Sequence, residues 1–435
     1  MATAAPIFFM RAIVNSRTNP KQLTTATAFQ TCLPDSINAG NLFLKVFFAI
    51  FAYNMLNIQS KLPGISTTIF SVMSKLAAEH NAINLSQGFP DYPCDPKLTE
   101  LVNIAMKDGF NQYAPMPGNT FLKETIAEKV AKLYAVDYNP DTEITVTAGG
   151  TQAIFTALAA IINPGDEVII FEPAYDSYAP TIRLLGGLVK TYELAPPSYG
   201  IDWDMVKKLF TSSTRMIILN SPQNPTGSIL SEEDMQQLIK LINGTDILIL
   251  SDEVYEHLIY DQQKHKSVML FPELRERSFV IASFGKLLHA TGWKLGYCLA
   301  PAQLTKEFRK VHQFNVFSVN SPMQQAIANY IKDPNNYNGI TAFFEKKRDY
   351  FRGLLAGSRF ELLPCNGSYF QCASFSKISD EKDTDFSMRL TAEFGVATIP
   401  VSAFYQKATD HKIIRFCFAK EDSTLALAAE KLKNV

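Results

Sequence analysis

The sequence lacks an excess of charge of either sign. Its 435 residues include 41 lysines and arginines against 42 aspartates and glutamates, which gives a formal net charge of −1. No sequence-wide positive field exists to attract phosphate backbones, so we expect no nucleic-acid partner. Hydrophobic residues make up 47% and charged residues 19% of the chain, which excludes disordered and collagen-like classes. The length is too great for one ordinary core and suggests two domains.

Clustered cysteines and histidines are also missing. The histidines form no H-E-x-x-H motif, and the cysteines, none in a C-x-x-C pair, are scattered: Cys32, Cys94, Cys298, Cys365, Cys372 and Cys417. A zinc or redox site needs neighbouring ligands, so the sequence predicts no metal site. Unpaired, reduced cysteines are typical of a cytoplasmic protein, and we expect that location. The apolar stretch Leu42–Tyr53 is interrupted by Lys45 and is shorter than the roughly 20 residues of a membrane helix, so no membrane span is expected.

Residues 1–54 differ from the rest of the chain. Their charged side chains are four basic ones and a single acidic one, Asp35. Three interpretations remain open: a transit-like presequence, a signal peptide whose apolar segment lies far from Met1, or an upstream start with Met55 as the true initiator. We favour Met55, because periodic sequence begins only after it. N-terminal sequencing of the native protein tests this expectation.

From Thr142 onward, short apolar runs alternate with amphipathic stretches. Such runs are typical of strands buried on both faces, as in a mostly parallel sheet covered by helices. Gly149-Gly150 separates the first strand from a helix, and Ser231 followed by three acidic residues predicts a helix start. The predicted strands are 144–147, 167–171, 216–219, 247–250, 279–282 and 295–300, and the predicted helices are 151–162 and 231–242.

After about Asn335 the pattern changes. Residues 339–355 read as one long helix, and residues 360–375 as an antiparallel pair centred on the turn Asn366-Gly367. Residues 413–418 read as a further strand and 425–433 as a closing helix. The fold class is therefore α/β, with a second, smaller α+β domain.

Chemically distinctive residues follow several of the predicted strands. Lys286 ends the segment Ser283-Phe284-Gly285-Lys286, where burial would lower the pKa of its amine and make it a nucleophile. A lysine capping a strand end in water is the alternative. Asp252 follows another strand, and Gly150-Thr151 opens a helix, where backbone N–H groups favour a phosphate. Ligands of open α/β sheets bind at this carboxyl edge, so these groups belong together.

These motifs resemble the fold type I, class I/II aminotransferases, which depend on pyridoxal 5'-phosphate (PLP). The resemblance runs from about Leu62 to the C-terminus. It is strongest toward the methionine and the kynurenine (glutamine) aminotransferases, through Asn84–Pro90, Asn111–Tyr113 and Ser283–Gly296. It implies a transaminase with amino acid and 2-oxo acid substrates, built as a homodimer with shared active sites. The implied domains are an atypical extension at 1–54, an arm and first part of the small domain at 55–96, a large PLP-binding domain at 97–335 and a small domain at 336–435.

The resemblance also implies a role for each site residue. Lys286 would hold PLP covalently and move the substrate's proton, Asp252 would pair with the pyridine nitrogen, and Tyr255 would contact the phenolic oxygen. Lys286, Asp252 and Tyr255 are thus the predicted catalytic residues. The implied PLP-binding residues are these three with Gly150, Thr151, Tyr175, Asn224, Ser283, Lys294 and, from the neighbouring subunit, Tyr113; the substrate-binding residues are Gly88, Asn224 and Arg415.

Several of these assignments have structural alternatives. Arg415 lies inside an apolar strand, so it either grips the substrate α-carboxylate or forms a buried salt bridge. Tyr175 and Tyr113 would otherwise be core aromatics. Lys294 stands where many class I members have arginine, and it supplies the charge without the bidentate fork.

The expected reaction moves the amino group of methionine, and of aromatic or other large apolar amino acids, to a 2-oxo acid. The pocket wall is expected to include Gly88–Tyr92 and aromatic residues of the partner subunit, and no distal arginine for a dicarboxylate is identifiable. The alternative is a kynurenine/glutamine aminotransferase with cysteine-S-conjugate β-lyase activity. A non-catalytic protein on the same fold is disfavoured by the joint presence of Lys286, Asp252, Asn224 and Arg415.

Overall fold

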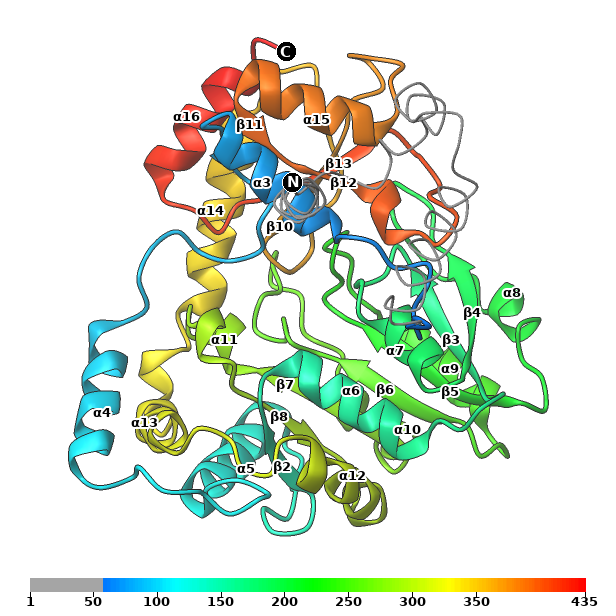
Figure 1. Cartoon of the computed structure of the whole chain (residues 1–435), viewed down its shortest axis with the longest axis vertical. Helices are drawn as coiled ribbons and strands as arrows, with labels where there is room; N and C mark the ends of the chain where they lie inside the picture. Colours follow the sequence, from blue (N-terminus) through cyan, green and yellow to red (C-terminus); the bar gives the residue numbers. More distant parts are fainter. Residues whose placement is uncertain (1–57) are drawn as a thin grey trace, which may run out of the picture. The chain divides into compact units, whose positions relative to one another are not determined.

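A seven-stranded sheet forms the centre of the chain (Figure 1). The computed structural model describes residues 58–435, so the predicted extension at 1–54 and Met55 lie outside the described residues. β8 runs antiparallel to both of its neighbours, while the other adjacent pairs are parallel, which confirms the mostly parallel sheet. In sheet order the strands are β2 (Ile144–Thr147), β8 (Gly296–Leu299), β7 (Ser278–Ser283), β6 (Leu248–Asp252), β5 (Thr214–Asn220), β3 (Glu167–Glu172) and β4 (Leu188–Glu193).

Alternate residues of the central strands enter two different cores. In β5, Met216 and Ile218 pack in one hydrophobic cluster, and Ile217 and Leu219 pack in the other. Side chains of successive strand residues point to opposite faces, so a continuous apolar run buries both faces at once. The first core includes α6 (Gly150–Ile161), α7 (Tyr178–Leu184) and α12 (Ala302–Asn315); the second includes α5 (Thr120–Tyr134), α9 (Glu232–Ile242) and α13 (Ser321–Ile331).

A smaller antiparallel sheet lies in the upper part of Figure 1. The predicted pair is confirmed, because Ala373 faces Leu362 and Ser374 faces Glu361. Its strands in order are β12 (Ile399–Pro400), β13 (Ile413–Cys417), β10 (Phe370–Ser374) and β9 (Glu361–Leu362). The segment β1 (Ile83–Asn84) pairs in parallel with β11 (Val396–Ala397) and thereby joins an early part of the chain to a late one. The helices nearby are α3 (Ile69–Glu79), α14 (Ile340–Leu354), α15 (Asp383–Phe394) and α16 (Asp422–Leu432).

The predicted helix start at Ser231 is confirmed in detail. Ser231 is the N-cap of α9, and its side chain and that of Asp234 form a reciprocal capping box. The strand β4 was not predicted, because its six residues are mostly half-buried and mix polar with apolar side chains at the sheet edge. The remaining helices are α4 (Pro96–Lys107), which packs on α13, and the short α8 (Trp203–Lys207), α10 (Pro272–Arg275) and α11 (Phe284–Leu287).

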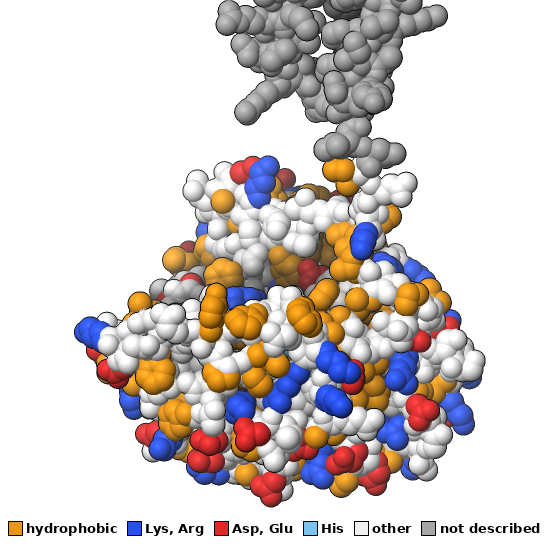
Figure 2. Space-filling view, turned by 60° about the horizontal axis from the view of Figure 1, so that its bottom comes forward, with side chains coloured by type: hydrophobic (Ala, Val, Ile, Leu, Met, Phe, Trp, Pro, Cys, Tyr) orange, Lys and Arg blue, Asp and Glu red, His pale blue; other side chains and the backbone are white. Residues whose placement is uncertain are grey.

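The surface carries charges of both signs without a one-sign patch on the face shown. Figure 2 shows lysine, arginine and acidic side chains interspersed over the lower part of this face, with hydrophobic side chains gathered beside a hollow. This matches the near-zero net charge. Among the described residues, every helix is too short or too polar to cross a membrane.

Candidate active site

A cavity of about 370 Å³ opens where the strands of the large sheet end. Asn220, Asp252 and Ser283 are the last residues of β5, β6 and β7, and all three line it. Asn220 and Asp252 are register partners across the adjacent strands, so the parallel sheet itself brings them together. Every predicted site residue lines this cavity except Tyr113: Gly88, Gly150, Thr151, Tyr175, Asn224, Asp252, Tyr255, Ser283, Lys286, Lys294 and Arg415.

Lys286 stands in α11, immediately after β7, with its amine held between two oxygens. Its Nζ donates to Tyr369 Oη at 2.7 Å and to the Gly88 carbonyl at 3.2 Å. It also lies 5.4 Å from the Tyr255 ring centre and 5.3 Å from that of Tyr369. Burial disfavours the ammonium form and lowers the pKa of Lys286 to about 8. Because these two hydrogen bonds hold Nζ inside the cavity, the alternative of a strand cap in open water is wrong, and the lowered pKa suits a base or nucleophile.

Asp252 is a buried carboxylate on the same cavity wall. Its Oδ2 accepts a 2.5 Å hydrogen bond from Tyr178 Oη, and its Oδ1 accepts a longer one of 3.3 Å from the Val254 backbone N–H. Burial raises the pKa of Asp252 to about 6, and these hydrogen bonds oppose that rise. The carboxylate can therefore hold a cationic ring nitrogen, whose charge would stabilise the ionised form.

The turn between β2 and α6 forms a narrow backbone cradle. Gly149 adopts φ +82° as the N-cap of α6, and no side chain caps the helix, so its first N–H groups face outward. A Cβ on Gly149 would lie 3.4 Å from Cε of Lys294, which places that side chain against the turn. A Cβ on Gly296 would lie 2.6 Å from the Ala282 carbonyl oxygen. Exposed N–H groups beside a lysine make a site for a phosphate.

Arg415 is fully buried in β13, and no carboxylate pairs with it among the described residues. Its Nη1 donates to Asn224 Oδ1 and its Nη2 to the Ser86 carbonyl, both at 2.7 Å. Its Nε has no partner in the described part of the chain. The guanidinium lies 3.9 Å from the ring centre of Phe370. A buried charge without a counter-charge is costly, so Arg415 is prepared to bind an anionic ligand. The alternative, a structural salt bridge, is not formed among the described residues.

Comparison with known proteins decides the family. The profile described as "Aminotransferase class I and II" matches residues 80–432. The chain belongs to the aminotransferase class I and II family. It is 48% identical to the methionine aminotransferase of Escherichia coli, over 88% of this chain and 99% of that protein. It is 35% identical to human kynurenine–oxoglutarate transaminase 3, over 86% and 89% of the two chains.

Solved structures agree with the sequence comparison. A crystal structure of an Escherichia coli protein identified as a methionine aminotransferase superposes with a TM-score of 0.86, over 88% of this chain and all of that one. N-succinyldiaminopimelate aminotransferase of Mycobacterium tuberculosis gives a TM-score of 0.83 at 35% identity, over 87% of this chain and 99% of that one. The chain is thus an enzyme, an aminotransferase of a PLP-dependent family that acts on amino and 2-oxo acids.

The remaining predicted residues of the aminotransferase site have distinct surroundings. Tyr175 Oη lies 3.2 Å from Thr151 Oγ1, and Tyr255 is buried with its ring edge-on to Tyr369. Tyr113 lies outside this cavity and is 81% exposed, so it is not a core tyrosine. The expectation that the pocket wall extends to Tyr92 is wrong: of that stretch only Gly88 and Phe89 line the cavity, and the Tyr92 ring instead packs edge-on against His289 and Phe343.

Several side chains of the site escaped sequence reasoning. Tyr178 and Tyr369 hold Asp252 and Lys286 by hydrogen bonds, and Asn220 links Asp252 to Asn224. Tyr178 could have been identified from the sequence because it follows Tyr175, a predicted site residue, by three positions. Tyr369 had no comparable signal, because it comes from the small sheet. Phe70, Phe89 and Phe370 form an aromatic wall of the cavity, of which the sequence suggested only Phe89, and the rings of Phe70 and Phe370 lie beside Arg415.

The donor set fits PLP. A phosphate suits the Gly149–Thr151 cradle with Lys294, and a pyridine nitrogen suits the buried Asp252 carboxylate. An aldehyde suits the Lys286 amine, whose pKa burial has lowered to about 8. The three groups line one cavity, as three functional groups of one small molecule require.

Proposed function

We propose that this aminotransferase transfers the amino group of methionine, and of other large apolar or aromatic amino acids, to a 2-oxo acid with PLP as its cofactor. One observation carries the proposal: the Lys286 amine, whose pKa is lowered, and a buried arginine with no ion-pair partner among the described residues line the same cavity. Methionine is favoured by the 48% identity to the Escherichia coli methionine aminotransferase and by the aromatic wall of Phe70, Phe89 and Phe370.

The cofactor would be held by residues around the large sheet. Lys294, Ser283 and the N–H groups of Gly150 and Thr151 would bind the phosphate, and Asp252 would bind the ring nitrogen. Asn224 and Tyr255 would bind the phenolic oxygen, and Tyr175 would cover the ring face. When bound, PLP supplies an electron-accepting ring that stabilises the negative charge left when the substrate loses its Cα proton.

The chain's own residues orient the substrate and move its proton. Arg415 would bind the α-carboxylate through both guanidinium branches, which fixes the direction of the Cα–H bond, with Gly88 and Asn224 beside it. Nζ of Lys286 would then take the proton from Cα. Tyr369 and the Gly88 carbonyl hold that nitrogen, so its approach is set before the substrate arrives. One carboxylate anchor serves both half-reactions, because donor and acceptor carry the same group.

The second candidate is a kynurenine/glutamine aminotransferase with cysteine-S-conjugate β-lyase activity. The 35% identity to human kynurenine–oxoglutarate transaminase 3 favours it, and so does an aromatic wall that accepts a planar side chain. Both activities begin by removing the Cα proton, so the same residues serve either. The two differ in product: a 2-oxo acid of unchanged carbon skeleton, or ammonia and pyruvate.

The working form is proposed to be a homodimer in the cytoplasm. Tyr113 is exposed outside its own cavity and stands edge-on to Phe317, a half-exposed ring. A tyrosine in this position is available to the phosphate of a partner's site.

The proposed domains are the arm and first small-domain segment at 55–96, the large domain at 97–335 and the small domain at 336–435. The β1–β11 pairing supports a discontinuous small domain.

The deciding experiment compares amino donors on the PLP-loaded enzyme. Methionine, kynurenine, phenylalanine and aspartate are offered with a panel of 2-oxo acids, and we expect methionine to give the highest kcat/KM. Lys286→Ala should lower turnover by about 10³-fold or more, because no other base replaces it. The control Lys306→Ala removes an exposed lysine of α12 and should leave turnover unchanged. Full turnover in Lys286→Ala contradicts the mechanism, and dominant ammonia and pyruvate from cysteine conjugates favour the lyase.

A further inference from the structure

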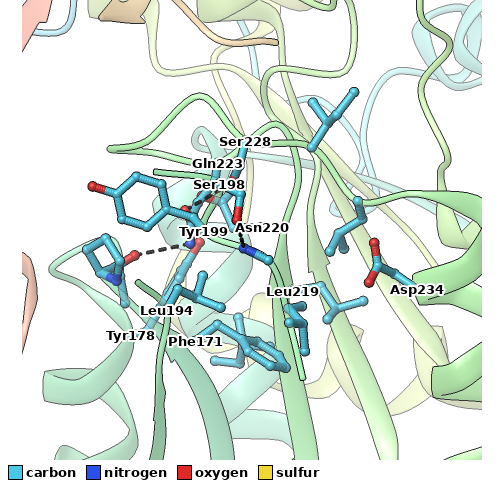
Figure 3. A pocket seen from close by; sticks show the side chains of 17 residues that line it. Phe171, Tyr178, Leu194, Ser198, Tyr199, Leu219, Asn220, Gln223, Ser228 and Asp234 are labelled. Atoms are coloured by element: carbon cyan, nitrogen blue, oxygen red, sulfur yellow. Dashed lines mark hydrogen bonds between the residues drawn. The ribbon is translucent and has the colours of Figure 1, made fainter. Parts of the chain in front are cut away.

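Tyr178 connects the active site to a second, smaller cavity. It is the first residue of α7, is 2% exposed and packs edge-on against Tyr175, with 5.7 Å between the ring centres. Figure 3 shows this second cavity, of about 60 Å³, with Tyr178 and Asn220 among the labelled side chains. Asn220 lines both cavities, whereas Tyr178 lines only the second one and reaches Asp252 through its hydroxyl.

The main chain of Asp252 is fixed independently of Tyr178. Asp252 pairs with Asn220 on β5 and with Ile281 on β7, so its strand is held on both sides. The Asn220 amide donates to the Asp252 carbonyl at 2.9 Å and accepts from the Asn224 N–H at 2.9 Å. What remains free is rotation of the Asp252 carboxylate about its side-chain bonds.

The carboxylate itself is oriented mainly by Tyr178. The bond from Tyr178 Oη to Oδ2 is 2.5 Å long, while the other contact, from the Val254 N–H to Oδ1, is 3.3 Å. A hydrogen bond to an ionised carboxylate is short and strong, and it favours the ionised form. Without the hydroxyl, a carboxylate buried at 4% exposure would keep one long hydrogen bond only.

We propose that Tyr178 is a positioning residue for the reaction, which acts through Asp252 by holding its carboxylate ionised and aimed at the cofactor's ring nitrogen. The proposal rests on PLP being the cofactor. Tyr178 does not line the active-site cavity, so the effect of its hydroxyl on the reaction must pass through Asp252. The ionisable groups that face Asp252 are Tyr175 and Tyr178 of the α7 region, Glu253 and Tyr255 beyond β6, and Lys286 of α11.

The test removes one hydroxyl and compares it with a matched control. Tyr178→Phe deletes the donor to Asp252. Tyr199→Phe deletes a hydroxyl that lines the same small cavity, is 4% exposed and has no hydrogen-bond partner among the described residues. Each variant is titrated with PLP after cofactor removal, its visible absorbance is followed against pH, and kcat and KM are measured with methionine.

We expect Tyr178→Phe to lower kcat by about 10- to 100-fold, because that factor corresponds to the loss of one hydrogen bond to a charged group. KM should change far less. PLP affinity should fall, and the pH transition of the visible absorbance should move relative to the unaltered enzyme. Tyr199→Phe should match the unaltered enzyme in all of these readouts. Equal behaviour of Tyr178→Phe and Tyr199→Phe overturns the role of Tyr178.

A double-substitution cycle separates positioning from a fold defect. In an Asp252→Asn background, Tyr178→Phe should have almost no further effect on PLP affinity or absorbance, since its partner carboxylate is gone. A fold defect would add to Asp252→Asn in full and would overturn the proposal. Failure of the unaltered chain to bind PLP contradicts the proposed function itself, which is distinguishable from PLP binding that is indifferent to Tyr178.

Discussion

Burial shifts the pKa of three ionisable side chains at the candidate active site, in each case toward the uncharged form. The pKa of Lys286 falls to about 8, that of Asp252 rises to about 6, and that of Arg415 is lowered by burial although the guanidinium stays charged. Each pKa shift reflects the free energy lost when the charged group is removed from water, a loss that is present before any ligand binds. A cationic ring nitrogen beside Asp252 and a substrate carboxylate beside Arg415 would supply the missing counter-charges, so ligand binding relieves that cost.

The pH dependence of cofactor uptake follows from Lys286. Only its neutral amine attacks an aldehyde, and the neutral fraction grows as pH rises through the pKa of about 8. We expect the rate of PLP uptake by the cofactor-free enzyme to rise with a midpoint near pH 8, measured by stopped-flow absorbance. An ordinary lysine would place the midpoint near 10.5. A rate that is flat between pH 6 and 9 would show that burial does not tune this amine.

Arg415 offers a test of carboxylate recognition. Arg415→Lys keeps a positive charge but loses the fork that binds two oxygens and its contacts to Asn224 and Ser86. We expect kcat/KM for every amino donor to fall by about 10- to 100-fold, whatever the donor's side chain. Arg215→Lys, at the amino end of β5, is the control and should have little effect. A loss confined to one donor would mean that Arg415 selects side chains.

At the scale of elements, the parallel sheet determines which residues meet. β5, β6 and β7 end in the same direction, so their last residues Asn220, Asp252 and Ser283 share one edge. β8 returns antiparallel from that edge, and its first residue, Gly296, passes close to the Gly149–Gly150 turn. The phosphate cradle therefore depends on a close approach of two backbones, which a side chain would prevent.

Gly296→Ala tests this close approach. The added Cβ would lie 2.6 Å from the Ala282 carbonyl oxygen and 3.1 Å from the Gly150 nitrogen. We expect the free energy of unfolding to fall by roughly 1–3 kcal/mol and PLP affinity to weaken, measured by urea unfolding and PLP titration. Gly353→Ala in α14 meets no atom within 4 Å and should instead stabilise the chain by about 0.5–1 kcal/mol. Equal stability of the two variants would contradict the cradle's tight packing.

At the scale of the whole molecule, the site is assembled from both sheets. Lys286 and Asp252 come from the large sheet, whereas Arg415 and Tyr369 come from the small one and its entering turn. The contacts that join them are polar and buried: Lys286 to Tyr369, and Arg415 to Asn224. The relative placement of the two sheets thus sets the distance between Lys286, the proposed base, and Arg415, the proposed carboxylate anchor.

The proposed homodimer can be tested by complementation. A dimer of one Lys286→Ala chain and one Tyr113→Ala chain contains one site with both defects and one site with neither. Random pairing after co-expression should therefore restore about a quarter of the unaltered activity, although each variant alone has little. Activity no higher than the sum of the two single variants would contradict shared sites. Light scattering of the unaltered enzyme checks the dimeric mass.

Much of the fold was predictable because its signals are local. Apolar runs such as 216–219 predict doubly covered strands, and the Asn366-Gly367 turn predicts the β9–β10 pair. The antiparallel direction of β8 and the pairing of β1 with β11 were not predictable. A short stretch of sequence carries no information on the direction of a strand or on a pairing partner far along the chain. Tyr92 shows the same limit: its proximity to Gly88 in sequence did not place it in the cavity.

The sequence by itself determined the family and the sheet type, and it predicted the functional groups Lys286, Asp252 and Arg415, since each follows or occupies a recognisable strand. Only the tertiary structure decided that these groups line one cavity and that Tyr178 and Tyr369 hold two of them. It also decided that Arg415 keeps no carboxylate partner among the described residues. The physical reason is that burial and long-range contacts, which tune charge, arise only when segments hundreds of residues apart pack together.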